Sequence, residues 1–296
     1  MSLKRFLASA AAALSLGTAA CATVDSPPAG AVPGPALWRV ADADTTIYLF
    51  GTVHALPQGK NWFDGRIERA FNASDELVTE IDVSGAASSA QALQAASMLP
   101  EGQSLRALMT ADDRQQYEAA LVGLGLPVEA LDRYEPWFAA MTLSLLPLLR
   151  SGYDTQSGVE LSLNGRAGTK TRGALETIEE QVALFDTLPQ DAQLAYLDET
   201  VEKLDEATST LDAMVAEWVE GDAVALAAML NAELTDPVLY ERLLTARNAN
   251  WAGWIEERLE RPGTVFIAVG AGHLAGAGSV QDQLQKRGVK VSRIWQ

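Results

Sequence analysis

Apolar residues gather in two long runs near opposite ends of the chain, and each run is followed by glycine and then histidine. The first run covers 45–50 and leads into Gly51-Thr52-Val53-His54, and the second covers 264–269 and leads into Gly270-Ala271-Gly272-His273. Short continuous apolar stretches rich in β-branched and aromatic residues are typical of strands buried on both faces. We therefore predict two buried strands, each of which ends in the same Gly-x-x-His motif.

The segment after the first motif predicts a helix and then another strand. Apolar residues of 63–71 recur at helical spacing, whereas 76–83 alternates so that Val78, Glu80 and Asp82 share one side of a strand. A strand, a helix and a strand in this order form a β-α-β unit, in which the two strands run parallel. Glu80 is therefore expected at the same end of the sheet as the first histidine.

The middle of the chain, about 86–260, has mostly helical patterns, and one short strand is predicted at 169–175. The apolar stretch 138–149 is too short to span a membrane and predicts a buried helix. After the second motif, 280–286 predicts a helix and 289–295 a final strand. The fold class is therefore α/β, with a small mixed, partly parallel central sheet and a large helical insertion between the first and last core strands.

Two segments precede the folded domain. Residues 1–22 have a basic start and an alanine- and leucine-rich stretch too short to cross a bilayer, which predicts a signal peptide or lipoprotein signal. Residues 23–35 are rich in proline and glycine and predict an extended tether. A single domain is expected over 36–296, and it begins with a strand at 37–40 that forms a hairpin with the first long run.

Cys21 is the only cysteine, so a disulfide within one chain is impossible. The preceding Thr18-Ala19-Ala20 resembles a bacterial lipobox, but the small residues around Cys21 also fit ordinary signal cleavage. Lipidation of Cys21 and plain cleavage both remain open. Either route predicts an exported protein, in the periplasm or attached to the outer membrane as a lipoprotein.

Composition and charge narrow the choice of partners. The chain has 296 residues, and its 48% of hydrophobic residues is enough for a large core. Its formal net charge of −17 would repel the phosphate backbone, which excludes nucleic acid as an expected partner. The same charge attracts cationic substrates and metal ions at low salt.

The chain has only two histidines, and both stand in the Gly-x-x-His motifs. If the two strands are neighbours, His54 and His273 meet at the carboxyl edge of the sheet, together with Glu80. Two imidazoles and a carboxylate are the ligand set of a catalytic zinc-type site. A metal-free alternative uses His54 as a general base and Glu80 to orient it. Asp82 is a candidate second ligand or a hydrogen-bond partner of an imidazole.

Several short segments together resemble the TraB/GumN family, to which the TIKI Wnt-inactivating proteins belong. The resemblance spans about 36 to the C-terminus. The segments that carry it are Gly51-Thr52-Val53-His54, Glu80 within 78–82, Gly158-Val159-Glu160, Leu175-Glu176-Thr177 with Gln181, Trp218 to Asp222, Arg247-Asn248 and Gly270-Ala271-Gly272-His273.

The resemblance implies an α/β core interrupted by a helical region, and a metal-dependent peptidase activity with manganese or cobalt as the metal. It also implies that His54, His273 and Glu80 form the active site. Arg247 and Asn248 match a family pair and are candidates to bind a substrate carboxylate or an oxyanion, or they are an ordinary pair on a helix surface. Glu160 stands where family members often carry aspartate, which makes it a candidate acid or base.

The sequence therefore predicts an exported, metal-dependent hydrolase of peptides or small molecules, with manganese, cobalt or zinc held by the two histidines and Glu80. Two alternatives are kept. One is a metal-independent, esterase-like hydrolase, and the other is a non-catalytic lipoprotein that binds haem, iron or a peptide, with Tyr48 as a candidate haem ligand. Glu176 is interpreted as a charge that favours the start of a helix. The oligomeric state is left open.

Overall fold

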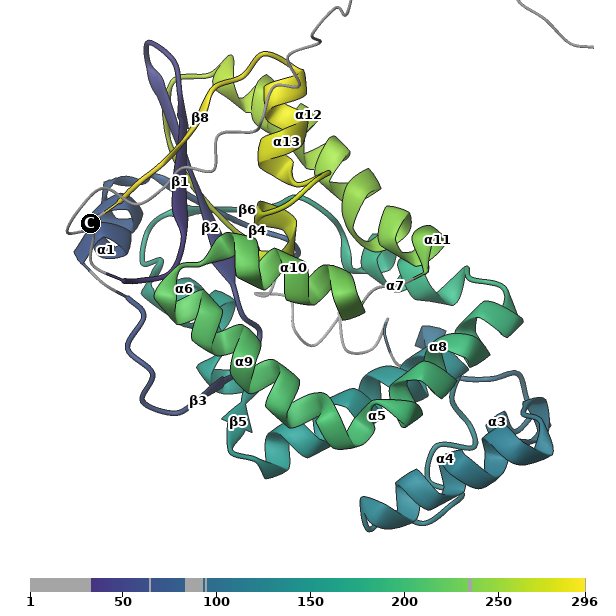
Figure 1. The fold of residues 1–296 in the computed structure, drawn as a ribbon. Coiled ribbons are helices and arrows are strands. Elements are labelled where there is room, and N and C mark those ends of the chain that lie inside the picture. Colours follow the sequence, from purple (N-terminus) through teal and green to yellow (C-terminus); the bar gives the residue numbers. More distant parts are fainter. Residues whose placement is uncertain (1–32, 64, 83–92, 94, 234–235, 296) are drawn as a thin grey trace, which may run out of the picture.

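The computed structural model describes residues 33–63, 65–82, 93, 95–233 and 236–295. The predicted export signal, most of the tether and Cys21 lie outside these ranges. Six strands form the central sheet in the order β6-β4-β7-β2-β1-β8 (Figure 1). Their bounds are Leu37–Ala41 for β1, Thr45–Thr52 for β2, Glu76–Thr79 for β4, Thr171–Ala174 for β6, Gly263–Gly270 for β7 and Val291–Arg293 for β8.

The four strands from β6 to β2 run parallel, and β1 and β8 extend the sheet in antiparallel pairings. This confirms the predicted α/β class with a mixed, partly parallel sheet. Strands β2 and β7 pair along their whole length, from Thr45 opposite Gly263 to Thr52 opposite Gly270. The two Gly-x-x-His motifs therefore leave the sheet side by side, as the hydrophobic pattern predicted.

Strand β4 departs from the sequence prediction in place and in length. It pairs with β7 and β6, so that β7 separates it from β2. It ends at Thr79, whereas the alternating pattern predicted a strand over 76–83. The Thr79 hydroxyl donates to the Ile81 carbonyl at 2.7 Å, and the chain bends at Glu80 and Ile81. Glu80 thus sits at the very end of its strand, close to β7.

Helices cover both faces of the sheet because successive strand residues point to opposite sides. Phe50 of β2 packs with the helices of one face, whereas its neighbour Leu49 packs with those of the other. The first face carries α1 (Gly65–Ala73), α6 (Val159–Arg166), α9 (Ala207–Glu220) and α10 (Ala223–Glu233), and the second carries α12 (Ala246–Leu259) and α13 (Val280–Lys286).

The helical insertion builds a second core away from the sheet. Leu105, Leu121, Leu143 and Leu197 are fully buried there, between four of its helices. Figure 1 shows α3 and α4 farthest from the sheet. The remaining elements are α3 (Leu105–Leu108), α4 (Ala111–Gly123), α5 (Pro136–Arg150), α7 (Ile178–Asp186), α8 (Gln190–Glu202), α11 (Pro237–Tyr240) and the small antiparallel pair β3 (Leu56–Pro57) and β5 (Tyr153–Asp154).

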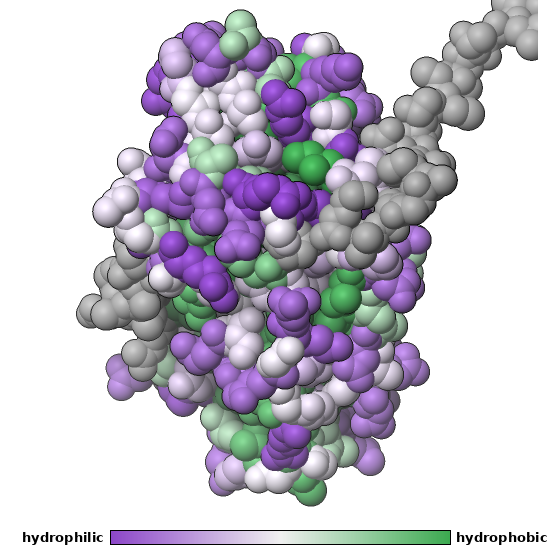
Figure 2. All heavy atoms as spheres, turned by 90° about the vertical axis from the view of Figure 1, so that its left-hand side faces the viewer, coloured by the Kyte–Doolittle hydropathy of each residue, from purple (hydrophilic) through white to green (hydrophobic). Residues whose placement is uncertain are grey.

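Two further features follow from local sequence. Helix α7 begins with a reciprocal capping box of Thr177 and Glu180. None of the helices in the described ranges is both long and apolar enough to cross a membrane. On the face shown in Figure 2, hydrophilic residues predominate and hydrophobic ones form small separate patches, in keeping with the acidic composition.

Candidate active site

The two histidines and Glu80 converge around Gly270. His54 follows β2, Glu80 follows β4, and His273 lies in a short 3-10 helix, Ala271–Leu274, that follows β7. A Cβ atom placed on Gly270 would lie 3.1 Å from Glu80 Oε1, 3.6 Å from His273 Cδ2 and 3.9 Å from His54 Nε2. The three side chains therefore border one small space, and the glycine keeps that space open.

His54 is paired with a carboxylate and open to the cavity. Its side chain is 73% exposed, and Nδ1 lies 2.7 Å from Glu160 Oε1. The Thr52 hydroxyl donates to the same carboxylate oxygen. The hydrogen bond that protonated His54 donates to Glu160 outweighs the opposing desolvation and raises the pKa of His54 from 6.5 to about 9. Within the described residues, Nε2 has no hydrogen-bond partner, and His54 lines the cavity.

The position of Glu160 depends on a close backbone contact. Val159 donates its backbone N–H to Val53 O at 3.0 Å, which brings the start of α6 against the loop before His54. A Cβ atom on Gly158 would clash with the carbonyl oxygen of His54. Only glycine allows this approach, and Glu160 follows in the first turn of α6. The Gly158-Val159-Glu160 segment is therefore built to bring a carboxylate to His54.

His273 has the opposite surroundings, since its side chain is only 6% exposed. Its Nδ1 lies 2.6 Å from Asn248 Oδ1, and Nε2 lies 3.1 Å from Arg247 Nη1. The Asn248 amide nitrogen donates to Gly278 O at 2.9 Å, which leaves its oxygen for the imidazole. The assigned tautomer therefore donates from Nδ1 and accepts at Nε2. Burial lowers the pKa of His273 to about 3, so the ring is neutral.

Glu80 is buried but ionised. Its Oε1 accepts the backbone N–H of Gly270 at 2.6 Å, and Oε2 accepts hydrogen bonds from Arg247 at 2.7 Å and Gln181 at 3.0 Å. Burial opposes ionisation of this carboxyl, but the charges of Arg247 and of protonated His54 and the Gly270 N–H lower the pKa of Glu80 to about 2. Glu80 therefore supplies a fixed negative charge between the two histidines.

Every N–H group of the Arg247 guanidinium has an acceptor within the protein. Nε donates to Glu176 at 2.8 Å, Nη1 is shared between Leu243 O and His273 Nε2 at 3.1 Å each, and Nη2 donates to Glu80 at 2.7 Å and Glu176 at 2.8 Å. A substrate carboxylate would have to displace one of these partners. The structure thus gives Arg247 a role inside the site, different from the substrate contact that the sequence suggested.

Other residues singled out in the sequence lie away from the cavity. Asn248 is 2% exposed and contacts His273 and Gly278, so it is neither a surface residue nor a substrate contact. Asp82 is exposed beyond Glu80. The ring of Tyr48 packs 6.5 Å from that of Phe266 and is absent from the cavity lining in the described chain. The structure therefore does not place Tyr48 as a haem ligand in this cavity.

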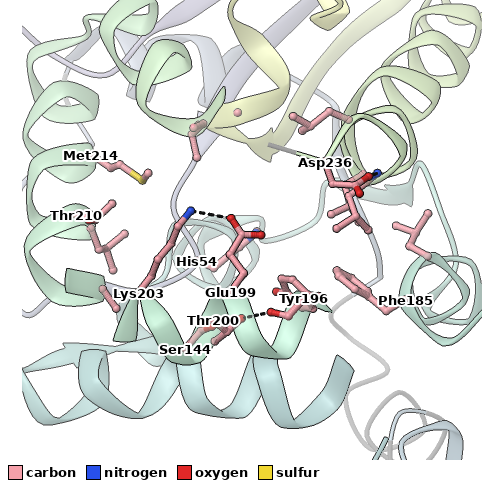
Figure 3. A pocket seen from close by; sticks show the side chains of 18 of the residues that line it. His54, Ser144, Phe185, Tyr196, Glu199, Thr200, Lys203, Thr210, Met214 and Asp236 are labelled. Atoms are coloured by element: carbon pink, nitrogen blue, oxygen red, sulfur yellow. Dashed lines mark hydrogen bonds and ion pairs between the residues drawn. The ribbon is translucent and has the colours of Figure 1, made fainter. Parts of the chain in front are cut away.

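The site opens into a cavity of about 620 Å³ whose walls come from the helical insertion. His54, Glu80, Gln181, Arg247 and His273 form one end. Figure 3 shows the ion pair of Glu199 and Lys203, 2.8 Å apart, in front of His54. The apolar lining residues are Leu148, Leu184, Phe185, Leu204, Ala207, Leu211, Met214, Leu230, Leu239, Leu243 and Leu244. The volume lies within the range of small-molecule and peptide sites.

The three predicted ligands do not form a compact metal-binding group in this geometry. His273 Nε2 and Glu80 Oε1 are 4.0 Å apart. No set of three histidine, cysteine or acidic side chains in the described part of the chain is arranged to hold a metal ion. Arg247 lies between the donor atoms of His273 and Glu80. Metal binding at this point would require the guanidinium to release His273.

Comparison with known proteins decides the family. The model of the TraB/PrgY/gumN family matches residues 36–293. The chain belongs to this family. It is 26% identical to the uncharacterized protein YbaP of Escherichia coli (strain K12), over 85% of this chain and 92% of that protein. It is 23% identical to an uncharacterized protein of Treponema pallidum (strain Nichols), over 84% and 80%.

Another relative has the name of an enzyme. The chain is 25% identical to the metalloprotease TIKI2 of Danio rerio, over 82% of this chain but only 57% of that protein. No solved structure matches the chain.

Glu176 was interpreted from the sequence as a helix-start charge, but its carboxylate accepts hydrogen bonds from Arg247. The indole N–H of the buried Trp251 also donates to Glu176, at 2.9 Å. The sequence contains the same signal for Glu176 as for Glu80, because each is an acidic residue just beyond a parallel strand. Its backbone N–H donates to Glu80 O at 2.8 Å, so the two strand ends lie together.

Proposed function

We propose that this protein is a hydrolase that cleaves peptide-like bonds at the end of the cavity where His54, Glu80 and His273 meet. The convergence of both Gly-x-x-His histidines and Glu80 around Gly270 is the observation that carries the proposal. The similarity to the metalloprotease TIKI2 supports it. The leucine-rich walls favour substrates with apolar side chains.

We further propose that His54, Glu80 and His273 hold a divalent metal, with manganese, cobalt or zinc as candidates. The donor chemistry fits, because two imidazoles and a carboxylate are a common catalytic ligand set. Each imidazole has its Nδ1 hydrogen-bonded to an oxygen, which is how metal-binding histidines are oriented, and Gly270 keeps room beside the donors. Such a metal, when bound, supplies a water of lowered pKa and polarises the carbonyl.

The residues of the chain supply positioning and proton transfer. Glu160 accepts a hydrogen bond from Nδ1 of His54 and leaves Nε2 directed at the cavity. Without a metal, the neutral form of His54, which its pKa of about 9 places at alkaline pH, can take a proton from an attacking water and return it to the leaving group. As a metal ligand, Nε2 would have no lone pair left for this step. Arg247 and Gln181 hold Glu80 in place by hydrogen bonds to Oε2. The apolar walls bind the substrate and limit access of bulk water.

A metal-independent hydrolase is the second candidate, and one observation favours it. Arg247 Nη1 is 3.1 Å from His273 Nε2 and so competes for the lone pair that a metal would need. In this alternative the Glu160–His54 pair acts as a carboxylate–imidazole general base, as in catalytic triads. An ester would be an easier substrate than a peptide for such a site. The haem- or iron-binding alternative is weaker, because its proposed ligand Tyr48 is not among the described residues that line the cavity.

Export is also a proposal. The basic, alanine- and leucine-rich start of the chain supports a signal in residues 1–22, followed by cleavage or by lipidation at Cys21. The protein would then work in the periplasm or at the outer membrane on a peptide or a small molecule.

The test is hydrolysis by the purified protein of a mixed library of internally quenched peptides, with and without chelator. We expect at least a tenfold loss in EDTA and recovery with Mn²⁺, Co²⁺ or Zn²⁺. A variant with both histidines replaced by alanine is the inactive control. Activity that persists in EDTA would favour the metal-independent alternative. Absence of peptide and ester hydrolysis with every metal would overturn the proposed function.

A further inference from the structure

We propose that Glu176 is a positioning residue that holds Arg247 against Glu80 and His273, and this inference rests on the proposed function. Glu176 follows β6, next to the end of β4, and its side chain is 12% exposed. It is absent from the cavity lining among the described residues. Glu176 therefore acts on the reaction through Arg247 and not by contact with substrate.

The contacts of Glu176 use its whole carboxylate. Oε1 accepts hydrogen bonds from Arg247 Nε at 2.8 Å and from the Trp251 indole at 2.9 Å. Oε2 accepts from Arg247 Nη2 at 2.8 Å and from Gln181 Nε2 at 3.2 Å. A buried carboxylate with these donors is a fixed point from which several side chains are oriented.

The role as a helix-start charge does not explain these contacts. Helix α7 begins at Ile178, and its first turn is already satisfied by the capping box of Thr177 and Glu180. Glu176 precedes the cap, and its carboxylate turns to Arg247 instead. Glu179, in the first turn of α7, is the exposed acidic residue that does suit the helix-dipole role.

The geometry shows what Glu176 does for Arg247. A guanidinium held by a carboxylate through two N–H groups has its plane and its remaining N–H directions fixed. Arg247 also stacks on Trp251, with Cζ 4.8 Å from the ring centroid. The N–H groups left over then meet His273 Nε2 and Glu80 Oε2. Glu176 thus sets the distance between the arginine and both of these groups.

The charges lead to the same conclusion. Arg247 and Glu80 are both nearly buried, and a buried cation is stable only when it is well paired. Without the charge of Glu176, Arg247 would depend on Glu80 alone and would draw that carboxylate toward itself. Glu80 would then leave its position beside Gly270. We therefore expect the reaction rate to fall while substrate binding is unchanged.

The test compares Glu176→Gln with Glu179→Gln, two equal changes of charge around the start of α7. On the quenched-peptide library, Glu176→Gln should lower kcat about 10- to 100-fold, the usual effect of losing such a supporting contact, while KM stays within about twofold. Glu179→Gln should leave both constants unchanged. Equal effects of the two variants would overturn the proposal, as would a loss confined to KM.

A second measurement needs no substrate. In NMR spectra, the Arg247 Nε–H should exchange slowly with water, and its signal is assigned by its loss in Arg247→Lys. Glu176→Gln should speed this exchange at least tenfold, and Glu179→Gln should not. Unchanged exchange would overturn the inference. If the unmodified protein cleaves no peptide, the proposed function fails, while the exchange rates still decide whether Glu176 holds Arg247.

A milder variant covers the case in which Glu176→Gln does not fold. Glu176→Asp keeps the charge but shortens the side chain, so kcat and exchange should lie between those of the unmodified protein and of a variant without the charge. Combining Glu176→Asp with Arg247→Lys should cost less than the sum of the two single losses, because both act on one interaction. Fully additive losses would contradict the proposal.

Discussion

The loops that end in His54 and His273 share one motif but give their imidazoles opposite surroundings. His54 is largely exposed and paired with the carboxylate of Glu160, whereas His273 is buried and paired with the amide of Asn248. A carboxylate stabilises the imidazolium, and burial beside a neutral amide disfavours it. The pKa of His54 is therefore raised and that of His273 lowered.

The difference shows which part of the chain decides the chemistry. The motifs place both histidines at one end of the sheet, but their partners come from the helical insertion, on opposite faces. Glu160 belongs to α6, and Asn248 belongs to α12. A repeated motif thus fixes where an imidazole lies, while distant residues fix its protonation.

Removal of the exposed imidazole should have the largest effect. His54→Ala should lower kcat/KM on the quenched-peptide library about 10²- to 10⁴-fold, the usual contribution of a general acid or base. Lys60→Ala, an exposed change on the segment that follows, is the matched control and should leave activity unchanged. A loss smaller than tenfold for His54→Ala would assign proton transfer to another group and remove the contrast between the two loops.

Removal of the partner of the buried imidazole should act on stability. Asn248→Ala leaves the Nδ1–H of His273 without an acceptor, and a buried unpaired donor costs about 1 to 3 kcal/mol. Urea unfolding measures this loss. Asn61→Ala, on an exposed asparagine, should change the free energy of unfolding by less than about 0.5 kcal/mol. Equal small effects of both changes would mean that the amide does not hold the ring.

The sequence predicted the α/β class and the two central strands, but not the order of all strands in the sheet. The apolar runs that became β2 and β7 are distinct because both are buried on two faces, and their shared motif suggested that they are neighbours. Strand β4 was expected to run parallel to β2, which it does, but the sequence did not indicate that β7 lies between them. Local patterns predict that a strand forms and which way it runs. Its neighbours depend on packing between segments far apart in the chain.

The site was predictable to a similar extent. His54, Glu80 and His273 were found because each follows a strand. Glu176 also follows a strand, but a helix begins soon after it, and this offered a simpler local explanation. The partners of Arg247 could not be predicted, because a guanidinium on α12 reaches residues from three other segments and no spacing in the sequence records those contacts.

The smallest effect concerns pH, and the two histidines should act in opposite directions. A group whose pKa is raised in the folded state stabilises the fold fully below its unfolded value, and the stabilisation is lost as pH rises through the folded value. For His54 this loss falls between pH 6.5 and about 9. Because the side chain is exposed and the ion pair is screened by solvent, the contribution is at most about 1 kcal/mol.

For His273 the sign reverses, because its folded pKa is depressed. Its contribution is complete above pH 6.5 and is lost as pH falls from 6.5 toward about 3.

Urea unfolding at several pH values separates the contributions of the two histidines. The difference in stability between the unmodified protein and Glu160→Gln should shrink from pH 6 to pH 10, because the carboxylate matters only while His54 is protonated. The difference between the unmodified protein and Asn248→Ala should stay constant from pH 6.5 to pH 10, because His273 is neutral there in both the folded and the unfolded chain. A difference for Glu160→Gln that grows with pH would mean that Glu160 does not stabilise the imidazolium, and the two loops would then differ in exposure alone.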